Sequence, residues 1–373
     1  MKKIIMFYGS DRAFSDIIPK VYRNLSSIAS EMDDDNKKME MVVTGFPQQE
    51  KPSEKPKKRK PKITNFVINA DEYNSVQEHV LTNFINFITK LDITNMFIQN
   101  PPIHLQEQIN RVFGDKNIIQ SKHQEYSILT KDAIRQIYTN YDNRILGQEV
   151  VKEQLLKSLF PVMDNKQSKP VVVLFYGDSG LGKTETVQYL TEVLGGSLFR
   201  KQFSMYQNNE FANYLFGGRY NEKSFAKDLL ARDSNVILLD EFDKANPLFH
   251  SAFYQLFDEG VYVDPNYKVD VRHALIFCTS NYQTLDEVKE KLGIPIYNRF
   301  DGIIKFSPLP VEAKRKIAEN ELVKIAQSDE LPEEVKEKLV LASEKLSNAR
   351  EIHRIVKDTV SLYQIQKICH IQT

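Results

Sequence analysis

Residues 171–190 read VVVLFYGDSGLGKTETVQYL. The first six are apolar and have the length and β-branched composition of a buried strand. Residues 177–184 then match the phosphate-loop pattern G-x-x-x-x-G-K-[ST] in full. Three glycines allow a tight turn in which successive N–H groups point at one anion. A strand, this loop and a helix in that order predict a nucleotide site.

The residues of the loop have separate expected tasks in binding ATP and Mg²⁺. Lys183 is expected to neutralise the β- and γ-phosphates, and the Thr184 hydroxyl to bind Mg²⁺. The helix that follows directs its positive N-terminal end at the phosphates. The predicted nucleotide-binding residues of the loop are Gly177, Asp178, Ser179, Gly180, Leu181, Gly182, Lys183 and Thr184.

Further apolar runs at residues 234–240, 274–280 and 302–306 alternate with helical segments. Together with the first strand they predict a parallel sheet, which binds ligands at the carboxyl ends of its strands. Asp240 ends one run, where a carboxylate can hold Mg²⁺ through water. Glu241 is then placed to orient or deprotonate the attacking water, and Asn281, after the next run, to fix that water.

Residues 1–125 predict a small α/β domain, because strand and helix patterns alternate in them. A strand is expected at 3–9 and a helix at 15–30. No catalytic constellation is evident in this region, which favours recognition of a partner. Residues 47–62 contain four prolines, and seven of the twelve residues at 51–62 are basic. A flexible charged loop is the favoured interpretation of 47–62, and a nuclear-import or nucleic-acid patch the alternative.

The composition argues against several classes of protein. Lys+Arg and Asp+Glu both number 50, so no global field favours nucleic acid or a membrane surface. The two cysteines, Cys278 and Cys369, are too few for a disulfide framework. No apolar stretch approaches the length of a membrane span, and the N-terminal residues are typical of a strand rather than a signal peptide. A cytoplasmic protein is expected.

Residues from about 144 to 360 resemble the AAA+ ATPase module, and within it the Clp-type unfoldase branch. The order and spacing of several stretches carry this resemblance, which covers somewhat over half of the chain. They are RILGQ from Arg144, GDSGLGKT, NVILLDEFDKANP, FHSAFYQLFDEGVYVD, FCTSN, IPIYNRFDGIIKF and NAREIHRIVKD.

The resemblance implies an α/β core at 126–307 and a helical lid at 308–373. By it, Lys183 and Thr184 are Walker A residues, Asp240 and Glu241 the Walker B pair, and Asn281 the sensor-1 residue. Arg299 matches the arginine finger that reaches the γ-phosphate of the neighbouring subunit, and Arg350 matches sensor 2. Ile145 and Leu146 would pack near the adenine. Hydrolysis of ATP with Mg²⁺ in a homo-oligomeric, hexamer-like ring is therefore implied.

The sequence departs from that pattern where unfoldases carry an aromatic pore loop. Residues 216–223 read FGGRYNEK, in which Tyr220 is the candidate aromatic, and Asn348 stands where glycine is usual. Three functions stay open at this point. The first is a ring-forming remodeller that selects a protein client through residues 1–125. The second is an ATP-gated scaffold that activates an effector protein without threading it, and the third is a nucleic-acid-dependent ATPase.

Overall fold

The computed structural model describes residues 1–32, 60–165, 168–205, 210–219, 222–325 and 331–369. The chain forms two compact units. Unit 1 contains Met1–Tyr126, Asn208–Asp233 and Tyr262–Val269, and unit 2 contains the remainder. The division at residues 125 and 307 that the sequence predicts stays a prediction. Tyr220 and most of the basic run, residues 51–59, lie outside the described residues.

Unit 1 is built on a parallel sheet with the strand order β2-β3-β4-β1-β5. Its strands are β1 (Lys3–Tyr8), β2 (Arg23–Asn24), β3 (Lys62–Ile68), β4 (Asp92–Gln99) and β5 (Ile119–His123). Apolar residues of β1 alternate between the two faces, because successive side chains of a strand point in opposite directions. Ile4 and Met6 join one core cluster, and Ile5 and Phe7 join the other.

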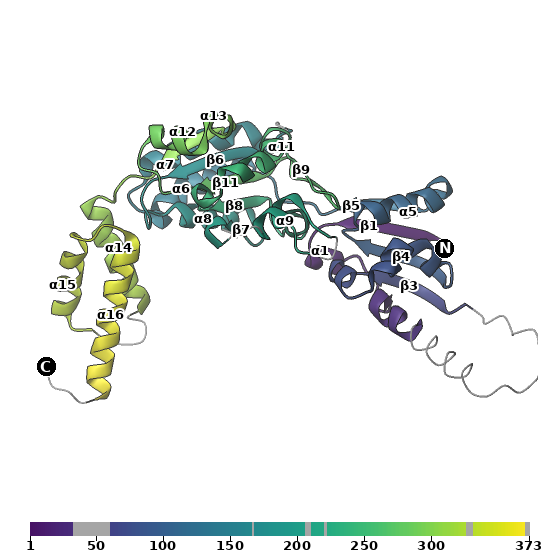
Figure 1. Cartoon of the computed structure of the whole chain (residues 1–373). Helices are drawn as coiled ribbons and strands as arrows, with labels where there is room; N and C mark the ends of the chain where they lie inside the picture. The colour runs from purple at the N-terminus through teal and green to yellow at the C-terminus, as the bar shows by residue number, and fades with distance from the viewer. Residues whose placement is uncertain (33–59, 166–167, 206–209, 220–221, 326–330, 370–373) are drawn as a thin grey trace, which may run out of the picture. The chain divides into compact units, whose positions relative to one another are not determined.

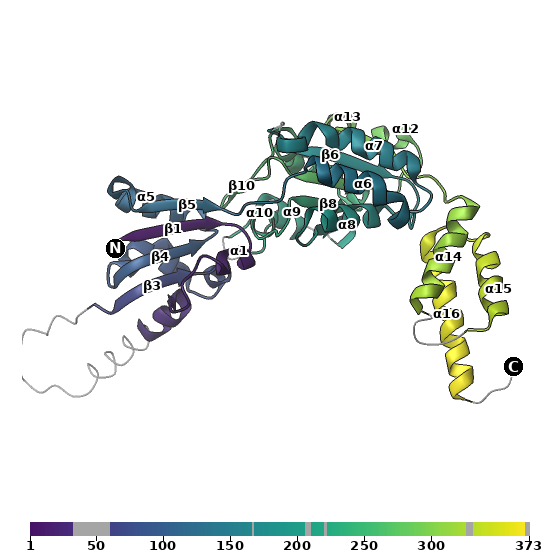
Figure 2. The ribbon, with the colours of Figure 1, turned by 180° about the vertical axis from the view of Figure 1, so that it is seen from behind.

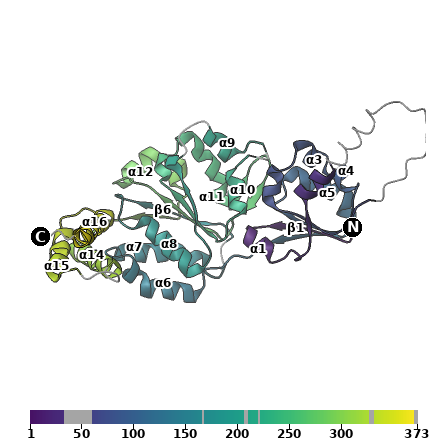
Figure 3. The ribbon, with the colours of Figure 1, turned by 90° about the horizontal axis from the view of Figure 1, so that it is seen from below.

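Helices cover both faces of this sheet (Figure 3). The larger cluster packs against α3 (Glu78–Thr82), α4 (Phe84–Ile88) and α5 (Ile103–Phe113), and the smaller against α1 (Asp11–Ser15). The helix expected at 15–30 is wrong in its first half, since α1 ends at Ser15 and helix resumes only at Leu25. Pro19 explains the difference, because proline removes a helical N–H and disfavours helix at the residue before it.

Two segments from the middle of the chain belong to unit 1. They contain α9 (Glu210–Phe216), α10 (Phe225–Leu230) and the turn between β9 (Val261–Val263) and β10 (Lys268–Asp270). The backbone N–H of Ile103 donates to the carbonyl of Asn266 at 2.8 Å. Lys227 Nζ donates to Asn74 Oδ1 at 3.2 Å. The N-terminal domain therefore holds residues that flank the predicted pore loop.

Unit 2 contains a second parallel sheet, ordered β12-β6-β11-β8-β7 (Figure 1). Its strands are β6 (Val171–Tyr176), β7 (Phe199–Gln202), β8 (Val236–Asp240), β11 (Leu275–Thr279) and β12 (Gly302–Lys305). Every residue of β6, β8 and β11 is buried, as their continuous apolar runs predict. The carboxyl ends of these three strands meet at one edge of the sheet.

The faces of this sheet are covered by different helices (Figure 3). One face packs against α6 (Lys131–Arg144), α7 (Glu149–Leu159) and α8 (Lys183–Leu194). Elsewhere in unit 2 lie α11 (Tyr254–Glu259), α12 (Leu285–Leu292) and α13 (Ile294–Tyr297). The aromatic residues Phe203, Phe242, Phe253 and Phe257 pack on one another beside Glu241.

The C-terminal part of unit 2 is helical (Figure 2). Its helices α14 (Val311–Ile325), α15 (Glu333–Ser343) and α16 (Ala349–Ile368) share an apolar core of their own. The predicted fold class is confirmed: a small α/β domain, an α/β core with a phosphate loop, and a helical lid. Among the described residues no helix is both long and apolar enough to cross a bilayer.

Candidate functional site

The loop between β6 and α8 has the backbone that its glycines predict. Gly177, Gly180 and Gly182 have φ values of +126°, +76° and +103°, which side-chain-bearing residues rarely adopt. A Cβ on Gly180 would also lie 2.9 Å from Asn348 Oδ1 at the start of α16. The loop therefore requires glycine here both for its conformation and for the close approach of the lid.

Lys183 begins α8 with its side chain folded back over this loop. Nζ donates to the carbonyl oxygens of Gly177 at 2.5 Å and Asp178 at 2.8 Å, and to Asn281 Oδ1 at 3.2 Å. The residue is only 8% exposed. Burial lowers the pKa of Lys183 from 10.5 to about 8, although nearby carboxylates, Asp243 first among them, oppose the shift. The ammonium group is thus placed in the loop at a cost that a bound anion would offset.

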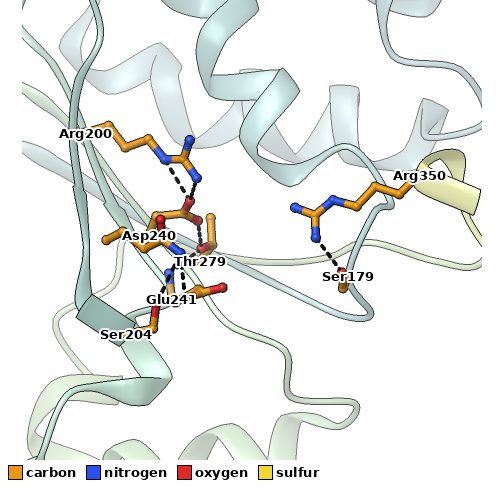
Figure 4. A network of polar contacts seen from close by, with 8 residues as sticks. Ser179, Arg200, Ser204, Asp240, Glu241, Thr279 and Arg350 are labelled. Atoms are coloured by element: carbon orange, nitrogen blue, oxygen red, sulfur yellow. Dashed lines mark hydrogen bonds and ion pairs between the residues drawn. The ribbon is translucent and has the colours of Figure 1, made fainter. Parts of the chain in front are cut away.

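Asp240, at the end of β8, has hydrogen bonds to both carboxylate oxygens (Figure 4). Thr279 Oγ1 donates to Oδ1 at 2.5 Å. Arg200, from β7, donates to Oδ2 through Nε at 2.9 Å and also through Nη2. These contacts hold the plane of a carboxylate that is itself only 5% exposed.

Glu241 follows in a left-handed conformation, with φ of +54°. Its N–H donates to Thr279 Oγ1 at 2.9 Å, so one hydroxyl holds both acidic residues. Gln202 Nε2 donates to Glu241 Oε2 at 3.1 Å. Hydrogen bonds from Ser204 and then Gln202 lower the pKa of Glu241, which keeps this carboxylate ionised at neutral pH (Figure 4).

Asn281 lies just beyond β11, at the same edge of the sheet. Its side chain accepts from Lys183 Nζ, and its carbonyl accepts from Gln283 Nε2 at 3.0 Å. Gln283 Nε2 also donates to Asp178 Oδ1 at 2.7 Å. The predicted sensor-1 residue is therefore joined to the phosphate loop directly and through Gln283.

Residues far away in the chain reach the same loop. Arg350, in the first turn of α16, donates from Nη1 to Ser179 Oγ at 3.0 Å (Figure 4). The Ala349 N–H donates to the Gly180 carbonyl at 3.1 Å. Ile145 is buried, and its Cγ2 would lie 3.4 Å from a Cβ on Gly182, whereas Leu146 is half-buried.

Arg299 makes its contacts in another part of unit 2. Its Nε donates to Asp258 Oδ2 at 2.9 Å, and Nη1 donates to the Pro295 carbonyl at 2.6 Å. Its guanidinium carbon lies 4.2 Å from the centre of the Tyr254 ring. The structure therefore brings together Lys183, Asp240, Glu241, Asn281 and Arg350, and places Arg299 among residues of α11 and α13.

The residues of this edge fit ATP with Mg²⁺. Among the described residues, the hydrogen bonds of Lys183 go to neutral oxygens, which leaves its charge available to a phosphate. Asp240 and the half-buried Thr184 supply carboxylate and hydroxyl oxygens, the donors that Mg²⁺ prefers. Thr184 is the first residue after Lys183 and so belongs to the first turn of α8.

Four polar residues of the site were absent from the sequence prediction: Arg200, Gln202, Ser204 and Thr279. A local signal existed for three of them. Arg200 and Gln202 alternate along the strand expected at 198–206, so they share one of its faces. Thr279 stands two residues before Asn281, at the carboxyl end of a predicted strand.

Comparisons with known proteins agree with a nucleotide site in this region. Residues 168–340 match the family model described as AAA domain (Cdc48 subfamily). The chaperone protein ClpB of Malacoplasma penetrans is 24% identical over 274 residues, which cover 66% of this chain and 36% of ClpB. The Clp protease ATP-binding subunit ClpE of Lactococcus lactis is 27% identical, over 67% of this chain and 40% of ClpE.

The AAA+ ATPase ClpV1 of Pseudomonas aeruginosa is 34% identical over 155 residues, which cover 38% of this chain and 17% of ClpV1. The chain thus matches well under half the length of these relatives. Among solved structures, the closed state of Hsp104 with ATPγS and FITC casein aligns with a TM-score of 0.54 and 14% identity. That alignment covers 99% of this chain and 89% of the Hsp104 chain, and it supports the fold.

Proposed function

Since residues 168–340 are a AAA+ ATPase domain of the Clp type, we propose that this chain hydrolyses ATP in an oligomeric ring and remodels a protein partner. One observation carries the proposal. Lys183, Asn281 and the pair Asp240–Glu241 follow three neighbouring strands and lie at one edge of the sheet, where Lys183 is hydrogen-bonded to Asn281 and Thr279 to both acidic residues.

The reaction follows from the chemistry of these side chains. Lys183 binds the β- and γ-phosphates, and Asp240 and Thr184 hold Mg²⁺, which when bound supplies positive charge to the phosphate oxygens. Glu241 accepts a proton from the water whose oxygen attacks the γ-phosphorus, while the bond to the β–γ bridging oxygen breaks and ADP leaves. Asn281 orients that water. The hydrogen bonds that lower the pKa of Glu241 keep it ionised, which is the form that can accept a proton.

The proposal includes a ring because Arg299 has no evident task within its own site. We assign it to the γ-phosphate of a neighbouring subunit, where a guanidinium stabilises the charge of the transferring phosphoryl group. Arg350 reports the state of the phosphate loop to the lid through Ser179. Ile145 lies beside Gly182, which supports its predicted place near the adenine together with Leu146. A hexamer-like ring and a cytoplasmic location stay predictions.

A second function is favoured by a specific feature of unit 1. The segments at 208–233 and 262–269 belong to this unit with the N-terminal domain, and Arg232 lies over the Tyr126 ring at 4.3 Å. Lys227 is hydrogen-bonded to Asn74. A segment held in this way is suited to transmit the nucleotide state to the N-terminal domain. It supports the ATP-gated scaffold, whereas the zero net charge disfavours nucleic acid.

Replacing Glu241 by Gln tests the proposed hydrolysis of ATP and separates the remodeller from the ATP-gated scaffold. We expect this variant to bind ATP and assemble like the wild type, while turnover falls by a factor of about a hundred or more because the base is lost. ATP binding, sedimentation and phosphate release are the measurements. The exposed Glu290, on α12, gives the control Glu290→Gln.

The partner proteins for this test come from a pull-down with the full-length Glu241→Gln chain and ATP. A remodeller stops unfolding its partner in this variant, whereas a scaffold keeps its partner bound and active. Turnover at the wild-type rate in Glu241→Gln would show that this carboxylate is not the base and would overturn the proposed mechanism.

A further inference from the structure

The guanidinium of Arg299 is held from two directions by α11. Tyr254 and Asp258 stand one helical turn apart on this helix, so they lie on the same side of it. Tyr254 presents its ring to the guanidinium carbon at 4.2 Å, and Asp258 Oδ2 accepts from Nε at 2.9 Å. The Pro295 carbonyl accepts from Nη1 at 2.6 Å. The Tyr254 ring, the Asp258 carboxylate and the Pro295 carbonyl together fix both the position and the plane of the guanidinium group.

The backbone around Arg299 is fixed as well. The Phe300 ring lies 6.1 Å from the ring of Phe257, which is buried on α11. The Asp301 N–H donates to the Val172 carbonyl at 2.7 Å, and Asp301 Oδ2 accepts from the Val172 N–H at 3.0 Å. Main chain and side chain of Arg299 are therefore attached to different rigid elements, the sheet and α11.

Stability alone does not account for this arrangement. Arg299 and Asp258 are 25% and 49% exposed, and ion pairs at such exposure contribute little to folding. The contacts use Nε and Nη1, whereas Nη2 takes part in neither of these hydrogen bonds. Asp258 and Pro295 therefore hold the group through two of its three nitrogens, and the third, Nη2, stays available to an oxygen of an anion.

We infer that Asp258 and Tyr254 are positioning residues for Arg299, which they hold ready for the γ-phosphate of a neighbouring subunit. This inference rests on the proposed function of Arg299. A free arginine side chain loses rotamer freedom when it binds phosphate, and a side chain that is already ordered loses less. A group that is preorganised for the transition state accelerates the chemical step more than it strengthens binding of the substrate.

The test replaces each positioning residue in the full chain and measures steady-state ATP hydrolysis. We expect Asp258→Ala and Tyr254→Leu to lower kcat by about ten- to a hundredfold, with ATP affinity nearly unchanged. Asp258→Asn, which keeps an oxygen for Nε, and Tyr254→Phe, which keeps the ring face, should lose less. Asp286, an exposed acidic residue of α12 paired with Lys289, supplies the control Asp286→Ala.

The same substitutions in an Arg299→Ala background separate positioning from a structural role. If Asp258 acts through Arg299, Asp258→Ala has no further effect on kcat once Arg299 is absent. An equal loss in both backgrounds would show a structural role and would overturn the inference. Should Asp258→Ala unfold, which its melting temperature would reveal, Asp258→Asn and the Tyr254 pair decide the question.

Mixing subunits tests the direction of the contact. Asp258→Ala subunits have an intact Glu241, and Glu241→Gln subunits have an intact Arg299 with its Asp258, so a mixed oligomer should have more activity than the two variants show separately. Wild-type kcat in Arg299→Ala would contradict the proposed function itself. A loss in Arg299→Ala of about a thousandfold, with wild-type kcat in Asp258→Ala, Asp258→Asn and Tyr254→Leu, would contradict only the positioning role.

Discussion

Lys183 combines a buried position with a charge that the binding of phosphate needs. Folding takes its ammonium group out of water, and the carbonyl oxygens of Gly177 and Asp178 replace only part of the lost solvation. The pKa accordingly falls from 10.5 to about 8. A bound triphosphate favours the charged form and raises this pKa again. Binding of ATP is therefore linked to binding of a proton.

This linkage predicts how ATP affinity depends on pH. Between about pH 8 and 10.5 the ligand-free folded protein binds fewer protons at Lys183 than the unfolded chain does, so this group's contribution to folding stability rises with pH there. ATP affinity should fall over the same range, with uptake of a proton on binding. Calorimetry at pH 8.5 in two buffers of different ionisation enthalpy measures that proton.

The control variant is Lys183→Arg, which stays charged at these pH values and should lose both the uptake and the pH dependence if it still binds ATP. Equal binding enthalpies in the two buffers for the wild type would show that the lysine is already charged in the ligand-free site. In that case ATP binding would not be linked to the uptake of a proton by Lys183.

Among the elements, α16 has the most direct route between nucleotide and lid. Its N-cap Asn348 accepts from the Glu351 N–H at 3.1 Å, and Glu351 Oε2 accepts from the Ser347 N–H at 2.8 Å. The next two residues, Ala349 and Arg350, contact the phosphate loop. The first turn of one helix thus both stabilises the lid and touches the site. We therefore expect a change of the loop on nucleotide binding to reach the lid through this turn.

We expect Asn348→Ala to destabilise the lid by about 1 kcal/mol, the usual cost of an N-cap, and Asn348→Gly by only a few tenths. Calorimetric unfolding of the full chain measures this, with Ser347→Ala as the control because the Ser347 side chain is not the cap. Equal melting temperatures for Asn348→Ala and Ser347→Ala would show that the cap contributes nothing measurable.

At the scale of the whole chain, unit 1 contains parts of three separate sequence regions. Two of them come from within the stretch that resembles the AAA+ module, and one of the two, residues 208–233, contains the predicted pore loop at 216–223 with its flanking segments. The separation between Lys227 and Asn74 is 153 residues. Any partner bound to the N-terminal domain is therefore bound to the unit that also contains these flanking segments.

Tyr220→Ala asks whether the oligomer threads its partner. If it does, removing this aromatic side chain should lower partner processing by about tenfold, equivalent to 1.4 kcal/mol of lost contact, while ATP hydrolysis stays near the wild-type rate. Tyr138→Ala, at an exposed tyrosine of α6, is the control. Unchanged processing in Tyr220→Ala would contradict threading and favour the scaffold.

The local features of the sequence were enough to locate the nucleotide site. Strand patterns predict β6, β8, β11 and β12 to within two residues, and the phosphate-loop glycines have the positive φ values expected of them. The helix expected at 15–30 is wrong around Pro19. The apolar spacing of these residues favours a helix, but the structure does not bury all of them, and Val21 is 83% exposed. Apolar spacing alone does not distinguish a helix face from an irregular turn.

Contacts between distant residues required the tertiary structure. Arg200 and Asp240 are 40 residues apart, and Asp258 and Arg299 are 41 apart. A strand or a loop motif is set by neighbouring residues, and its period can be recognised in a short window. The hydrogen-bond partner of a charged side chain such as arginine depends instead on which strands become neighbours and on how helices pack against them. The sequence of residues 171–190 thus identifies where ATP binds, whereas folding selects the side chains that hold Asp240, Glu241 and Arg299 in place.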